Sequence, residues 1–107
     1  MAVSEIIVNP NGGGVLNPTL LTSGSVTHGQ TATVNAPKNK RYVVTASANY
    51  TNSADQSRGQ AYIEDGTATS LSTGTNLTIT YDTANEQIKL TNSASSTDVS
   101  YAVIQLD

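Results

Sequence analysis

The sequence predicts an all-β fold: a single small antiparallel β-sandwich, jelly-roll-like, with about eight strands and an extended N-terminal arm. Apolar and polar residues alternate with period two in several segments, as where Leu77, Ile79 and Tyr81 interleave with threonines. This is the period of a strand with one buried face. Turn residues recur about every 8–12 residues, and no stretch longer than about ten shows helical periodicity. Because the Cys-Trp-Cys pattern of immunoglobulin domains is absent, a jelly roll is favoured.

The chain divides into an arm over residues 1–18 and a β-sandwich domain over residues 19–107. Pro10, Pro18 and the run Gly12-Gly13-Gly14 preclude a regular strand or helix in the arm. In the domain, Val, Ile, Thr and Tyr suit strand positions. We expect strands over residues 19–26, 30–35, 41–50, 58–64, 67–71, 76–81, 86–91 and 98–106.

The connections between these segments carry recognisable turn chemistry. Residues 27–29 form a tight connection between a first pair of strands, with Gly29 supplying a positive φ. Asp65-Gly66 is a strong hairpin signal between the strands at 58–64 and 67–71. The last three segments follow one another through short polar turns and predict a three-stranded meander over residues 76–106.

The final segment is apolar on both faces. Val99 and Val103 lie on one side of the expected strand, and Ile104 and Leu106 lie on the other. A strand of this kind is either central in the sandwich or covered by another subunit.

Composition excludes several classes of protein. With 107 residues and no cysteine, the chain has a thin core and neither disulfides nor thiolate metal sites, so oligomerisation is the remaining aid to stability. Five Lys and Arg against eight Asp and Glu give a net charge of -3, which provides no basic patch for nucleic acid. No run approaches the roughly 20 apolar residues of a membrane helix. No signal peptide is expected, so synthesis in a cytoplasm is predicted.

The acidic residues offer little catalytic or metal chemistry. They fall at strand ends and turns, whereas a glycosidase needs two carboxyls in one cleft. Asp65, Asp82 and Asp98 could supply oxygens to a loop calcium site, but no dense Asp-x-Asp-x-Asp pattern supports one. His28 is the only histidine and is interpreted as a turn or surface residue, and no Gly-x-Ser-x-Gly motif occurs. We therefore expect no enzymatic activity, cofactor or metal.

Binding of a glycan is a fairer candidate, because sugars stack on exposed aromatic rings. Tyr50 and Tyr62 are the tyrosines we expect to be exposed, while the other three are expected to pack in the core with hydrogen-bonded hydroxyls. Arg41 ends a basic loop and is a candidate contact for a glycan or an acidic partner.

The chain resembles small all-β bacteriophage virion proteins of the head-decoration (cement) or tail-fibre-tip type. The resemblance is carried by Ser25-Val-Thr-His-Gly29, Tyr42-Val-Val44, Leu77-Thr-Ile-Thr-Tyr81, Ile88-Lys-Leu-Thr-Asn92 and Tyr101-Ala-Val-Ile104. It implies a symmetric homo-oligomer, with a trimer favoured, that lies in the virion and has no cofactor or catalysis.

Length separates the two types, because a tail fibre needs an anchor and a shaft besides its tip. We therefore expect a cement protein that bridges subunits of the major capsid protein, and a receptor-binding tip or a carbohydrate-binding module is the alternative. The arm residues Ile6, Ile7, Val8 and Val15 are expected to contact the partner.

Overall fold

The computed structural model of the chain describes residues 16–48 and 57–107. Eight strands lie in these ranges. They are β1 (Thr19–Val26), β2 (Thr31–Asn35), β3 (Tyr42–Ala48), β4 (Arg58–Glu64), β5 (Thr67–Thr75), β6 (Leu77–Asp82), β7 (Gln87–Asn92) and β8 (Val99–Gln105). The described part of the chain holds no helix long and apolar enough to span a membrane. The predicted all-β class and the positions of the strands are confirmed, except that β5 continues to Thr75 rather than ending at Leu71.

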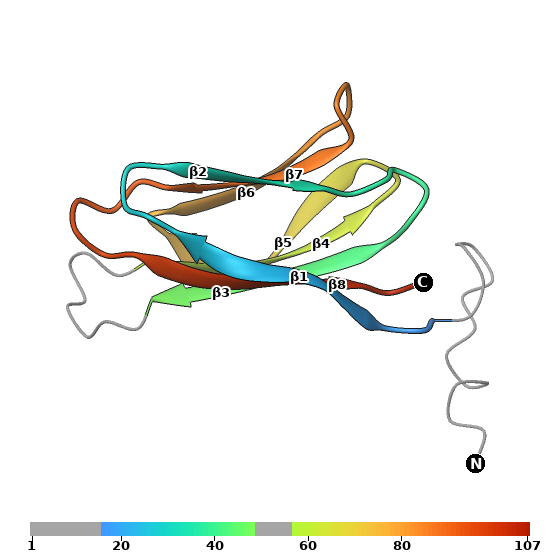
Figure 1. Ribbon diagram of the computed structural model, residues 1–107, viewed down its shortest axis with the longest axis horizontal. Coiled ribbons are helices and arrows are strands. Elements are labelled where there is room, and N and C mark those ends of the chain that lie inside the picture. The colour runs from blue at the N-terminus through green and yellow to red at the C-terminus, as the bar shows by residue number, and fades with distance from the viewer. Residues whose placement is uncertain (1–15, 49–56) are drawn as a thin grey trace, which may run out of the picture.

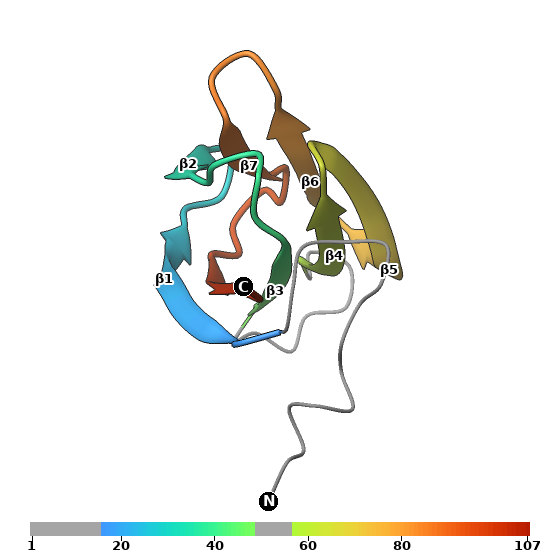
Figure 2. The ribbon, with the colours of Figure 1, turned by 90° about the vertical axis from the view of Figure 1, so that its right-hand side faces the viewer.

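The strands form two antiparallel sheets that lie one above the other (Figure 1). One sheet has five strands in the order β1-β8-β3-β4-β5, and the other has three in the order β2-β7-β6. The five-stranded sheet curves, so that β4 and β5 rise beside β6 (Figure 2). The two ends of the described chain meet at one end of the layers, where the Asn17 amide donates to the Leu106 carbonyl.

The core lies between the two sheets and is built from the inward half of each alternating strand. Its buried members are Val26, Val34, Ala36, Tyr42, Val44, Ala46, Ile63, Ile88, Leu90, Val99 and Val103. Both sheets contribute to this set. In β7 the buried Ile88 and Leu90 alternate with Gln87 and Lys89, as the period-two pattern predicts. β8 lies between β1 and β3, which confirms that the two-faced strand is central in its sheet.

Two expectations about strand neighbours are wrong. β6 and β7 pair as expected, but β8 leaves them for the other sheet, so residues 76–106 are not a meander. Likewise, β1 and β2 lie in different sheets. The reason for the second is local: Gly29 N donates to Asn92 O and Asn92 N donates to Gln30 O, so β2 pairs with β7 directly after the turn.

Two turns have the backbone conformation that their residues predict. Asp65 and Gly66 both have positive φ, at 51° and 75°, and they join β4 to β5 as a two-residue hairpin turn. Gly29 has a φ of 74° in the turn between β1 and β2. Glycine adopts this left-handed conformation without the steric cost that a Cβ brings.

Candidate functional site

The outer face of the five-stranded sheet, turned away from the core, carries a continuous row of apolar side chains. Strand register places Leu20, Ile104, Val43, Tyr62 and Thr69 side by side across all five strands. We call the first four of these the apolar row. Leu20 is 61% exposed, and the other three are partly exposed. The row therefore presents apolar surface to solvent where a strand face ordinarily carries polar residues.

A shallow hollow of about 240 Å³ lies on the same face, beyond the apolar row. It is lined by Thr45, Ala46, Ser47, Ser100, Tyr101 and Ala102 of β3 and β8. The outward-facing side chains of this set are all small. Ser47 pairs with Ser100, and Thr45 pairs with Ala102. Exposed Arg58 lies beside Ser47 in the next strand. The outer face thus passes from an apolar row through a hollow to a cationic residue.

A polar cluster borders the apolar row at the end of the sheet where the chain ends meet. Arg41 is only 4% exposed. Its backbone N donates to Asp107 Oδ1 at 2.9 Å, and its Nε donates to Asp107 Oδ2 at 3.1 Å. The Tyr62 hydroxyl donates to Glu64 Oε1 at 3.0 Å. Burial, followed by the hydrogen bond and charge of Glu64, raises the pKa of Tyr62, whereas Arg41 acts in the opposite direction. The phenol therefore stays protonated at neutral pH.

Two core tyrosines brace the connection between β2 and β3. Tyr42 donates to the Pro37 carbonyl and Tyr81 donates to the Ala36 carbonyl, each at 2.6 Å. Burial, with smaller contributions from Tyr81, Asp107 and Glu86, raises the pKa of Tyr42 to about 12. These hydroxyls act as structural donors, as expected for tyrosines in alternating strands.

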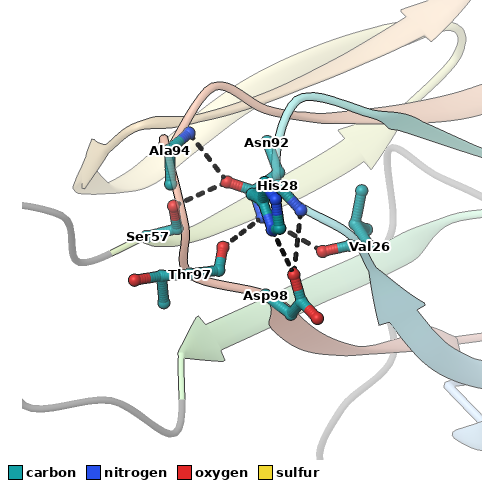
Figure 3. Close-up of polar contacts among 7 residues, drawn as sticks. All are labelled: Val26, His28, Ser57, Asn92, Ala94, Thr97 and Asp98. Atoms are coloured by element: carbon teal, nitrogen blue, oxygen red, sulfur yellow. Dashed lines mark hydrogen bonds and ion pairs between the residues drawn. The ribbon is translucent and has the colours of Figure 1, made fainter.

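The opposite end of the molecule is held by Asn92, which is fully buried (Figure 3). Its Nδ2 donates to the carbonyls of Val26 at 3.0 Å and Thr97 at 2.9 Å. Its Oδ1 accepts from the Ser57 hydroxyl at 2.8 Å and from the Ala94 amide at 3.1 Å. One side chain thus joins the end of β1, the connection from β7 to β8 and the start of β4.

His28 and Asp98 form an exposed pair beside this network (Figure 3). The His28 backbone N donates to Asp98 Oδ1 at 3.0 Å, and His28 Nδ1 lies 2.8 Å from the same oxygen. The backbone hydrogen bond, followed by the side-chain one, lowers the pKa of Asp98 below its ordinary value of 3.8. His28 lies in the turn, as the sequence predicts, and helps to tie that turn to the start of β8.

The three aspartates considered for calcium do not come together. Asp98 pairs with His28, Asp82 binds Asn85 and Lys89, and Asp65 lies 4.0 Å from Lys38. Within residues 16–48 and 57–107, no group of three or more potential metal ligands is gathered. Each of these three aspartates instead lies beside a different set of partners.

The structure places only part of the predicted contact set. Ile6, Ile7, Val8, Val15 and Tyr50 lie outside the described residues.

Tyr62 and Arg41 are brought together on the outer face, but Arg41 is buried rather than displayed by a solvated loop.

Leu20, Ile104 and Asn92 were not identified as functional from the sequence. Asn92 continues the inward alternation of Ile88 and Leu90, and this signal could have indicated a buried asparagine.

Comparison of the chain with models of protein families, with curated proteins and with solved structures finds no match.

Replacing Asn92 by alanine should lower the free energy of unfolding by about 3 kcal/mol, because several buried polar groups lose their partner. Urea unfolding followed by circular dichroism measures this loss. Asn35→Ala is the matched control, since Asn35 is exposed in β2, and it should cost under about 0.5 kcal/mol. Equal losses for the two variants would show that Asn92 does not hold this end of the molecule.

Asp98 should titrate below pH 3.8 in the folded protein. Because its folded pKa is depressed, the group adds stability at higher pH, and this is lost as pH falls through the folded pKa. Carboxyl-carbon NMR measures the titration. His28→Ala should return the pKa only part of the way, since the backbone N–H of residue 28 is the larger cause and remains. A full return to the ordinary value would contradict this assignment.

Proposed function

We propose that this chain is a non-enzymatic structural protein of a bacteriophage virion. In this proposal it is a capsid decoration (cement) protein that binds the head and stabilises it by bridging capsid subunits. The outer face of the five-stranded sheet carries the proposal. An exposed apolar row beside a shallow hollow suits docking on a protein surface better than it suits chemistry on a small substrate.

Polar contacts fasten the segments around the outer face at both ends of the molecule. Arg41 and Asp107 form a buried ion pair with two hydrogen bonds next to the apolar row. Asn92 fastens three segments at the other end. A preorganised face loses little conformational freedom on binding, so more of its buried area is converted into affinity.

Bridging follows from two contacts made by one chain. The apolar row docks on one capsid subunit, and the arm residues Ile6, Ile7, Val8 and Val15 reach a neighbour. Each buried apolar side chain contributes about 1.5–3 kcal/mol before ordering costs. Many copies bind around a shell, and we propose that the protein is a homotrimer. Both features raise the overall affinity through avidity, although each contact is modest.

The topology we propose within the all-β class is a jelly-roll variant. A jelly roll folds a long hairpin on itself, so that its first and last strands pair and the next strands inward pair in turn. The pairs β1 with β8, β2 with β7 and β4 with β5 support this proposal. β3 departs from the pattern, because it pairs with β4 and β8 rather than with β6.

A receptor-binding tip or carbohydrate-binding module is the second candidate, and Tyr62 is the observation that favours it. Its partly exposed ring lies on the same face as a hollow lined by serine and threonine hydroxyls. Such a surface can combine stacking with hydrogen bonds to a sugar. Glycan-array binding that is lost on Tyr62→Ala would favour this candidate over cement.

Leu20→Glu should weaken attachment to phage heads at least tenfold, because a charge replaces an exposed apolar contact in the row. The measurement is immunogold labelling and quantitative blotting of particles purified from the phage-producing host. Leu71→Glu is the matched control: Leu71 is 53% exposed, but lies on β5 at the opposite edge of the sheet.

Deletion of residues 1–14 should likewise leave a folded domain that no longer joins the particle. Unimpaired incorporation of that truncation, or labelling confined to tail tips, would overturn the proposed cement function.

A further inference from the structure

We propose that the edge of β6 binds an extended, uncharged peptide segment of another protein, which adds to the three-stranded sheet as a fourth strand. One aliphatic side chain of that segment fills a pocket between β6 and the pair β4 and β5. The site is separate from the outer face, and the inference does not rest on the identity of any virion partner.

The two sheets differ in width, and β6 lies where the smaller sheet ends. The larger sheet has five strands and the smaller has three, in the order β2-β7-β6. β4 and β5 lie beside β6 (Figure 2), but β6 is hydrogen-bonded to neither of them. The smaller sheet therefore has an edge at β6 to which a further strand can pair.

A pocket of about 220 Å³ lies between this edge and the larger sheet. Gly59, Ala61 and Ser70 line one side, and Leu77 and Ile79 of β6 line the other. Ser70 lies opposite Ala61 in the pairing of β4 with β5. Because these three side chains are small, they leave space between the sheets. A cavity of about 150 Å³ holds a benzene molecule, so this pocket accommodates a valine or leucine side chain.

The backbone of β6 presents hydrogen-bonding groups to the pocket. Leu77 lies opposite Asn92 of β7, but the Asn92 N–H donates to the carbonyl of Gln30, just before β2. In an antiparallel pair, hydrogen-bonded and non-hydrogen-bonded positions alternate. Leu77 and Ile79 therefore point their N–H and C=O groups away from β7, whereas Thr78 points its own toward β7.

The lining of the pocket indicates the chemistry of the occupant. None of its residues is charged, and β6 carries no charged residue before Asp82. A charged side chain would lose its hydration here without gaining an opposite charge. An edge of backbone groups pairs with another backbone, and a pocket beside it selects alternate side chains. The site thus fits an extended segment in which an aliphatic residue lies between small polar ones.

The position of the edge favours a single free segment over a second folded copy of this chain. β4 and β5 lie on the far side of the pocket, so a strand held in a complete sheet would collide with them. Within residues 16–48 and 57–107, all eight strands already pair in the two sheets of their own chain. The described part of a second copy therefore has no strand to donate without unfolding.

Hydrogen exchange of the free, full-length protein tests the edge itself. The amides of Leu77 and Ile79 should exchange about tenfold or more faster than those of Thr78 and Thr80, because only the latter pair with β7. Protection of Leu77 and Ile79 in the free protein would overturn the proposal. If that protection is independent of protein concentration, the chain itself covers the edge, and if it rises with concentration, a second copy does.

Binding is tested with the end-blocked peptide acetyl-Ser-Thr-Val-Thr-Ser-amide, followed by heteronuclear NMR of the full-length protein. The peptide should shift the amide signals of Leu77 and Ile79 and slow their exchange. One control peptide carries an N-methylated valine, which removes the N–H that pairs with β6, and a second has lysine in place of valine. Each control should bind about tenfold or more weakly, since it lacks either the backbone donor or the aliphatic group.

A variant of the protein tests the pocket with the same peptide. Ser70→Leu fills the pocket from β5 and should weaken binding about tenfold. Thr69→Leu is the matched control, because it places the same side chain on the outer face of the same strand and should leave binding unchanged. Ala61→Val replaces Ser70→Leu if the latter variant fails to fold. Signals of Leu77 and Ile79 that do not move, equal binding of the N-methylated peptide, or shifts confined to β1 or β2 would each contradict the proposal.

Discussion

The buried hydrogen-bond network of Asn92 is the interaction on which the arrangement of the two sheets most depends. Its side chain serves the end of β1, the connection into β8 and the residue before β4, while its backbone groups start the pairing of β2 with β7. When every polar group of a buried amide has a hydrogen-bond partner, the amide favours one arrangement of the segments around it. Any other arrangement would leave a polar group in the core without a partner. The crossing of the chain between layers at this end is thus held by hydrogen bonds as well as by the packing of buried Val26 and Val99.

The two faces of β8 divide stability from binding. Val99 and Val103 face inward and are buried, whereas Ala102 and Ile104 face outward and are partly exposed. The inward side chains of β8 pack in the core, so its outward side chains are available to contact a partner. The same division holds in β3, where Val43 faces outward. The proposed function uses this outward set.

Period-two alternation, together with turn residues, was enough to predict eight strands and most of their boundaries, and in β6 and β7 it also indicated the side that faces the core. It could not predict which strands are neighbours, since the alternation of β7 and β8 is the same whether they share a sheet or not. The hairpin at Asp65-Gly66 could be predicted because its turn chemistry is local. By contrast, the burial of Arg41 depends on Asp107, which is distant in sequence and near only in the fold. The apolar row is also a product of register across five strands, so no single segment reveals it.

The position of β8 between β1 and β3 has a consequence for how the chain reaches this structure. β1 has no partner in its sheet except β8, and Val26 must wait for Val99 before it can pair. Pairing between such distant segments makes folding slow, on a scale of milliseconds to seconds. During synthesis β1 and β3 emerge well before β8, and each exposes an unsatisfied edge in the meantime. Of the eight described strands, the last to be synthesised is thus the one that closes this sheet, and β1 and β3 are most vulnerable to association with other chains before it emerges.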